Sequence, residues 1–115
     1  MMKPLSLLSI LLLMNTHTFA LEIIAHRGYS AIAPENTVAA FKLAWEKGSD
    51  ACELDLYLTA DNQIVLFHDA DTKRTTGIEG KVIEKTLTEL QKLDAGLWKG
   101  ETWKGEPVPS LAQAL

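Results

Sequence analysis

The most informative stretch of the sequence is residues 51–68, which read ACELDLYLTADNQIVLFH. Apolar and polar side chains alternate strictly along residues 51–58, which is the pattern of a β-strand with two different faces. Residues 64–68 form a second extended run, and the connection at 59–63 is too short for a crossover between parallel strands. We therefore predict that this stretch folds as an antiparallel hairpin.

The register of this hairpin decides which side chains meet. If its tip lies between Asp61 and Asn62, Asp55 is directly opposite His68. The alternation then places Glu53 on the same face as these two residues. The sequence therefore predicts that two carboxylates and one imidazole gather on one face of the hairpin.

Glu53 and Asp55 are candidate metal ligands. They are two residues apart on one strand face, so their oxygens can reach a single cation, and Ca²⁺ and Mg²⁺ prefer oxygen ligands. The alternative is a solvated face with no ligand. The opposite face favours the metal site, because its side chains would pack under helices and turn the acidic face inward, where unpaired charge is costly. The residues of that opposite face are Cys52, Leu54, Leu56 and Leu58.

Two histidines lie where apolar runs end. His26 follows the run at 22–25, which reads as a short buried strand, and His68 closes the hairpin. Imidazole exchanges protons near neutral pH, so the pair could act as a general acid and a general base. A structural role for each histidine is the alternative. Asp69, next to His68, could orient or cap rather than catalyse.

Arg27 directly follows His26 and is a candidate phosphate ligand. Its guanidinium offers a fixed fork of donors that matches phosphate oxygens, and Gly28 permits a tight turn beside it. An anionic phosphodiester would be a natural ligand for such a turn. The alternative is a surface ion pair between Arg27 and Glu35.

Helix signals occur at two places in the interior of the chain. Asn36 is a plausible N-cap for a helix whose apolar residues recur up to Trp45, and Lys47-Gly48 is typical of its C-terminal end. Residues 86–89 resemble a capping box that opens a short helix through Leu93. Residues 98–109 contain Gly and Pro and are predicted to form a loop.

The N-terminal residues 1–20 have the features of a signal peptide. A basic start at Lys3 precedes an apolar run at 5–14 that is too short to span a bilayer, and cleavage is expected after Ala20. A buried N-terminal helix is the alternative reading. We therefore expect an exported protein, periplasmic or extracellular, without a stable membrane anchor.

The composition of the remaining residues 21–115 excludes some partners. Without residues 1–20 the 11 basic residues become 10 against an unchanged 15 acidic ones, which gives a net charge of −5. An acidic chain of this kind is not expected to bind nucleic acid or an anionic membrane. A single cysteine, Cys52, excludes an internal disulfide, and its apolar neighbours indicate a buried thiol.

The last residues, 110–115, read as the opening turn of a helix. An ordinary domain would not stop there, so we expect residues 21–115 to be the N-terminal part of a larger domain. Nothing in the composition suggests a domain boundary inside them.

The motifs together resemble the glycerophosphodiester phosphodiesterase family. Each motif is weak alone, but their order and number make the combination specific, and the similarity continues through residues 73–77 to residues 109–111. The motifs are His26-Arg27-Gly28, Pro34-Glu35-Asn36-Thr37, Glu53-Leu54-Asp55 and His68-Asp69.

The resemblance implies an α/β fold, a distorted (β/α)₈ TIM barrel of which this chain is the N-terminal portion, with the active site at the C-terminal ends of the strands. It implies that His26 and His68 are the acid and base, that Arg27 holds the phosphate, and that Glu53 and Asp55 bind a divalent cation, Ca²⁺ or Mg²⁺. Glu35 is implied to support this site, either near the metal or against the turn at 26–28.

The implied reaction is hydrolysis of a small-molecule glycerophosphodiester to glycerol 3-phosphate and an alcohol, within glycerophospholipid metabolism. A further acidic metal ligand and a lysine normally come from a later strand of a barrel of about 250 residues. We therefore expect residues 21–115 alone to be poorly soluble or unfolded and to show little activity. The alternatives are a lysophospholipase D-type lipid phosphodiesterase and a non-catalytic truncated homologue.

Overall fold

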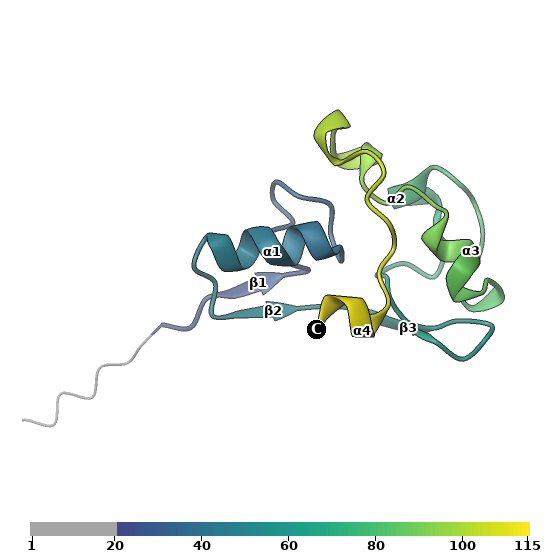
Figure 1. The fold of residues 1–115 in the computed structure, drawn as a ribbon, viewed down its shortest axis with the longest axis horizontal. Helices are drawn as coiled ribbons and strands as arrows, with labels where there is room; N and C mark the ends of the chain where they lie inside the picture. Colours follow the sequence, from purple (N-terminus) through teal and green to yellow (C-terminus); the bar gives the residue numbers. More distant parts are fainter. Residues whose placement is uncertain (1–20) are drawn as a thin grey trace, which may run out of the picture.

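The computed structural model describes residues 21–115, so the predicted signal peptide at 1–20 lies outside the described residues. Within the described part, no helix is long and apolar enough to cross a membrane. Figure 1 shows short strands and helices joined by long loops. In chain order the elements are β1 (Ile24–His26), α1 (Val38–Glu46), β2 (Ala51–Glu53), β3 (Leu56–Leu58), β4 (Ile64–Leu66), α2 (Lys73–Thr76), the 3₁₀ helix η1 (Val82–Glu84), α3 (Leu87–Gln91), the 3₁₀ helices η2 (Leu97–Lys99) and η3 (Glu101–Trp103), and α4 (Leu111–Ala114).

The first structural unit is β1–α1–β2. β1 and β2 pair in parallel, with His26 opposite Glu53, and α1 lies along this pair (Figure 1). The helix turns Ala40, Phe41 and Ala44 inward. A parallel pair needs such a crossover helix, so the predicted order of strand, loop, helix and strand is confirmed.

The N-cap of α1 is Thr37 rather than Asn36. The Thr37 hydroxyl accepts a hydrogen bond from the backbone N–H of Ala40 at 3.2 Å, as expected of an N-cap residue. Asn36 lies one residue earlier in the left-handed region, with φ 55°, and is buried. The predicted end is confirmed, because Lys47 is the C-cap and Gly48 follows it at φ 82°.

The single strand predicted at 51–58 is broken. β2 ends at Glu53 and pairs with β1, whereas β3 begins at Leu56 and pairs only with β4. Leu54 and Asp55 lie between the two sheets. The period-two pattern could not show this break, because alternation continues through it.

The hairpin β3–β4 is antiparallel as predicted, but its register differs by one residue. Leu58 pairs with Ile64 and Leu56 with Leu66, so the backbone of Asp55 meets Phe67 instead of His68, with the Phe67 N–H donating to the Asp55 carbonyl at 3.1 Å. A slip of one residue moves the side chains of one strand to the other face.

The loop at 59–63 explains the register. The Thr59 hydroxyl bonds to the Asp61 carboxylate at 2.6 Å and accepts the Gln63 N–H at 2.9 Å. Asn62 adopts a left-handed conformation, with φ 57°. These contacts close a five-residue loop centred on Asp61, not a loop with its tip between Asp61 and Asn62.

The prediction that Leu56 and Leu58 pack under helices is wrong for the described chain. Their exposures are 48% and 53%, while Tyr57, on the opposite face, packs against the core. The prediction assumed one flat strand from 51 to 58, and the break at 54–55 removes that assumption. Cys52 is also only half buried, although burial still raises the pKa of its thiol.

The main hydrophobic core lies between the hairpin and the segments that follow it. Its buried members come from β4 and the residue after it, η1, α3, the loop between α3 and η2, and the loop after η3: Val65, Phe67, Val82, Leu90, Ala95 and Val108. The capping box of Thr86 and Glu89 is confirmed, and α3 ends at Gln91, two residues before the predicted Leu93. The contacts of this core hold residues 82–108 against β4.

The described chain ends in the helix that the sequence indicated. The Leu66 N–H donates to the Pro109 carbonyl at 3.0 Å, which brings the chain back beside β4. Ser110 and Gln113 then form a second capping box that opens α4. α4 contacts β4 and α1.

Candidate functional site

The candidate acid or base His26 lies opposite a candidate metal ligand. Parallel pairing puts His26 and Glu53 at the C-terminal ends of β1 and β2, where barrel enzymes place their active sites. The His26 Nε2 atom is 3.8 Å from Glu53 Oε2. Two residues that are 27 positions apart therefore meet because their strands are neighbours.

Arg27 contacts three acidic residues of this site. Its backbone N–H donates to Glu53 Oε2 at 3.1 Å, its Nη1 donates to Glu35 Oε1 at 3.2 Å, and its Nε is 3.3 Å from Asp55 Oδ2. The side chain is only 18% exposed, and its buried Nε forms no hydrogen bond with any of the residues that the structure describes. Arg27 also adopts a left-handed φ of 58°, which is uncommon outside Gly and Asn.

The ion pair between Arg27 and Glu35 exists, but it is not the surface pair of the alternative reading. The two side chains are only 18% and 11% exposed. The next residue, Gly28, has φ 76° and lies so close to α1 that an added Cβ would be 2.7 Å from the Ala40 backbone. The turn at 26–28 is therefore pressed against the helix that follows it.

Asn36 holds Asp55, and sequence reasoning missed this role. Its Nδ2 donates to Asp55 Oδ2 at 2.9 Å, and its Oδ1 accepts the Asp55 backbone N–H at 3.1 Å. This reciprocal pair fixes the residue that interrupts the two sheets. The signal in the sequence was the residue type, because Asn adopts the left-handed conformation more readily than most residues do.

Glu53 and Asp55 each leave one carboxylate oxygen free, and such oxygens are suitable ligands for a hard cation. Glu53 uses Oε2 for Arg27 and Asp55 uses Oδ2 for Asn36, while Oε1 and Oδ1 accept no hydrogen bond within residues 21–115. Each carboxylate is thus oriented by one oxygen and open at the other. No cluster of three or more His, Cys, Asp or Glu side chains able to hold a metal occurs in the described part.

His68 is oriented by Asp69 and does not pair with Asp55 or Glu53 among the described residues. Its Nδ1 lies 2.6 Å from Asp69 Oδ1. Hydrogen bonds from Arg74, and then from His68, hold the pKa of Asp69 well below its usual range. The expected grouping of Glu53, Asp55 and His68 on one hairpin face is therefore wrong, because the register and the strand break both differ.

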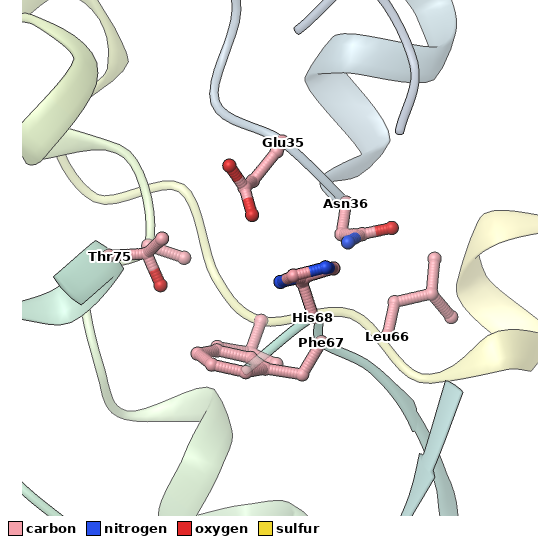
Figure 2. A pocket seen from close by; sticks show the side chains of 8 residues that line it. Glu35, Asn36, Leu66, Phe67, His68 and Thr75 are labelled. Atoms are coloured by element: carbon pink, nitrogen blue, oxygen red, sulfur yellow. The ribbon is translucent and has the colours of Figure 1, made fainter. Parts of the chain in front are cut away.

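A small pocket lies beside His68. Figure 2 shows Glu35 and Asn36 on one side of the His68 ring, with Thr75 of α2 at the edge. Its other lining residues are Leu66, Phe67, Ala95 and Val108. The pocket places polar groups from the loop before α1 near those that follow β4.

Glu35 accepts hydrogen bonds from two arginines. Burial acts to raise the pKa of Glu35, but the guanidinium groups of Arg74 and Arg27 outweigh it and the pKa is lowered. Arg74 was quoted in the sequence only as part of the 73–77 motif, with no role assigned. Its contribution depends on contacts with residues up to 39 positions away, which no local pattern reveals.

Comparisons with known proteins agree with this geometry. Residues 26–115 match the glycerophosphoryl diester phosphodiesterase family. A glycerophosphodiester phosphodiesterase of Caldanaerobacter subterraneus is 53% identical over 93 residues, which cover 81% of this chain and 38% of that protein. A second relative, from Bacillus subtilis, is 38% identical over 100 residues.

Solved structures are similar as well. An Oleispira antarctica phosphodiesterase in complex with the product sn-glycerol-3-phosphate has a TM-score of 0.80 at 44% identity, over 84% of this chain and 39% of that chain. A glycerophosphodiester phosphodiesterase from Agrobacterium tumefaciens has a TM-score of 0.77 at 41% identity, over 80% and 40% of the two chains.

These relatives confirm the predicted fold class, so β1–α1–β2 and the segments after it form a portion of a (β/α)₈ barrel of the phosphodiesterase type. The chain spans about two fifths of the length of the relatives that it matches. On its motifs, its fold and its similarity over residues 26–115, the chain belongs to the glycerophosphoryl diester phosphodiesterase family.

Proposed function

We propose that this chain supplies part of the active site of a metal-dependent enzyme that hydrolyses glycerophosphodiesters to glycerol 3-phosphate and an alcohol. The observation that carries the proposal is the meeting of His26, Arg27 and Glu53 at the C-terminal ends of two parallel strands. Family membership supports the enzyme class. The remaining groups of the site would come from later segments of the barrel, which the relatives contain and residues 21–115 do not include.

Arg27 is the proposed phosphate ligand. Its side chain is held by Glu35 and lies beside Asp55, while its buried Nε lacks a hydrogen bond within the described chain. The charge of the guanidinium would offset the charge of a phosphodiester bound beside it.

His26 and His68 are the proposed acid and base. Both side chains remain partly exposed, at 68% and 40%, and so can reach a substrate and exchange protons with it. One histidine would take a proton from the attacking hydroxyl or water, and the other would give a proton to the leaving alkoxide. Asp69 holds His68 by Nδ1, which leaves Nε2 available for this transfer.

Glu53 and Asp55 are the proposed ligands of Ca²⁺ or Mg²⁺. Each presents one oriented carboxylate with a free oxygen, and these ions take six or more oxygen ligands, so substrate, water and further protein oxygens would complete the shell. When bound, the ion would offset negative charge that develops on the phosphoryl oxygens. We also propose export to the periplasm or the cell exterior, on the strength of residues 1–20 alone.

The test is hydrolysis of glycerophosphocholine by the full-length protein that carries this sequence, with and without a chelator. The His26→Ala variant should lose at least about 100-fold in rate, since proton transfer by a positioned side chain commonly contributes that much. The Glu53→Ala variant removes a proposed metal ligand and should also slow hydrolysis strongly. Thr86→Ala, which removes only the α3 cap, is the matched control and should retain activity. Unchanged rates in both site variants would overturn the mechanism.

A further inference from the structure

We propose that Arg74 is a positioning residue that holds His68 and Arg27 at a fixed separation. In this role Arg74 does not contact the substrate. It acts through two carboxylates, Asp69 and Glu35, each of which contacts one of the candidate site residues. The inference rests on the function proposed above for His68 and Arg27.

The contacts of Arg74 form two forks. On one side, Nε donates to Asp69 Oδ2 at 2.7 Å and Nη2 donates to Asp69 Oδ1 at 3.1 Å. On the other side, Nη1 and Nη2 donate to the two oxygens of Glu35 at 3.1 and 2.7 Å. All three guanidinium nitrogens are therefore in use, and bidentate pairs of this kind fix orientation as well as distance.

Each carboxylate passes the constraint on to a site residue. Asp69 Oδ1 also contacts His68 Nδ1 at 2.6 Å, and Glu35 Oε1 also accepts a hydrogen bond from Arg27 Nη1 at 3.2 Å. The result is a continuous chain of charged contacts from the segment after β4 to the turn after β1. No other pair of hydrogen-bonded side chains in residues 21–115 links those two segments.

The guanidinium of Arg74 is itself held in place. It lies over the ring of Trp98, with 5.7 Å between its central carbon and the ring centroid, and the indole N–H donates to the Ala95 carbonyl at 2.9 Å. Lys99 lies 5.4 Å from the same ring and donates to the Ser30 carbonyl at 2.7 Å. This cation–π contact adds to the two forks in restricting a side chain that is 43% exposed.

The chemical consequence concerns the tautomer of His68. A carboxylate only accepts hydrogen bonds, so Asp69 favours the neutral form of His68 that carries its proton on Nδ1. Asp69 can do this only while its own orientation is fixed, and Arg74 supplies both of its other hydrogen bonds among the described residues. Without Arg74, Asp69 would rotate and His68 would sample both tautomers.

The experiment compares Arg74→Gln with Lys73→Gln in the full-length protein that carries this sequence. Lys73 is the matched control, because it lies on the same short helix and, among residues 21–115, its side chain makes only an exposed 3.8 Å ion pair with Glu79. Arg74→Gln should lower kcat for glycerophosphocholine by about 10- to 100-fold, since misplacement of a group by about 1 Å can cost that much. Arg74→Lys keeps the charge but not the forks, so it should recover little activity, while Lys73→Gln should match the unmodified protein.

A double-mutant cycle separates positioning from a general loss of structure. Asp69→Asn and Arg74→Gln act on the same link, so the double variant should be no slower than the slower single variant, whereas independent structural damage would multiply the two effects. Multiplied effects, or a kcat of Arg74→Gln equal to that of Lys73→Gln, would overturn the proposal.

A spectroscopic measurement tests the inference independently of turnover. ¹⁵N chemical shifts of His68, assigned with a His68→Asn variant, should report the Nδ1-protonated tautomer in the unmodified protein and a mixture in Arg74→Gln. A protein that shows this change but no hydrolysis would refute the proposed function and retain the positioning link. Hydrolysis with an unchanged His68 tautomer in Arg74→Gln would refute the positioning link alone.

Discussion

Gly28 offers a sharp test of how the turn at 26–28 is built, through the substitution Gly28→Ala. Its φ of 76° costs a residue with a Cβ about 1–2 kcal/mol. The new Cβ would also lie 2.7 Å from the backbone and Cβ of Ala40, so α1 or the turn must shift, and overpacking of this kind costs about 1–3 kcal/mol more. The expected loss in the free energy of unfolding is therefore about 2–5 kcal/mol.

Gly48→Ala is the matched control for this change. Gly48 has a similar φ of 82°, but an added Cβ meets nothing within 4 Å, so only the backbone cost of about 1–2 kcal/mol applies. Urea unfolding of the full-length variants, followed by circular dichroism, measures both losses. If Gly28→Ala is no less stable than Gly48→Ala, the close approach of the turn to α1 is not a real constraint, and the reasoning fails.

Three further predictions follow from the site and its surroundings. Asn36→Ala should lower the free energy of unfolding by about 1–3 kcal/mol, because it leaves part-buried groups of Asp55 without hydrogen-bond partners. The same variant should bind Mg²⁺ about 10- to 100-fold more weakly in titration calorimetry. Unchanged Mg²⁺ binding would show that Asn36 does not orient Asp55 as a ligand. The pKa values of Asp69 and Glu35 are lowered in the folded protein, so their contribution to stability is complete above the unfolded-state pKa of about 4 and is lost as pH falls below it. The free energy of unfolding should therefore fall more steeply with decreasing pH in the unmodified protein than in Arg74→Gln. Equal slopes in the two proteins would contradict this. Residues 21–115 alone should aggregate and show little phosphodiesterase activity, because Leu56, Leu58 and Ile64 are 44–53% exposed; a soluble, active preparation in size-exclusion chromatography and rate assays would refute this.

Local patterns predicted much of the fold correctly. The capping box at Thr86 depends on residues three positions apart, and the helix at 38–46 depends on apolar spacing within a few turns, so the sequence carries these signals directly. The hairpin was also predictable, because a five-residue connection permits little else.

The errors arose where the decisive contacts are distant or depend on turn geometry. The hairpin register was wrong by one residue, because it is set by the side-chain bonds of Thr59 and by the left-handed Asn62 rather than by strand alternation. The break at 54–55 depends on Asn36, which is nearly 20 residues earlier and fixes Asp55 outside both sheets.

The candidate site shows the same division. Parallel pairing brought His26 beside Glu53 once a barrel was assumed, so this contact followed from topology. The link from His68 through Asp69, Arg74 and Glu35 to Arg27 did not, because it depends on side chains from segments 39 residues apart. Sequence motifs therefore identified the candidate residues better than they identified the contacts that position them.

The most direct test of the central claim is the identity of the product. ³¹P NMR of glycerophosphocholine incubated with the full-length protein and Mg²⁺ or Ca²⁺ should show glycerol 3-phosphate as the single new phosphorus species, and a His68→Asn variant should form it at least about 100-fold more slowly. Lysophosphatidylcholine in a parallel sample should react far more slowly. Phosphocholine as the product, a preference for lysophosphatidylcholine, or an unchanged rate in His68→Asn would contradict the proposed role of this chain.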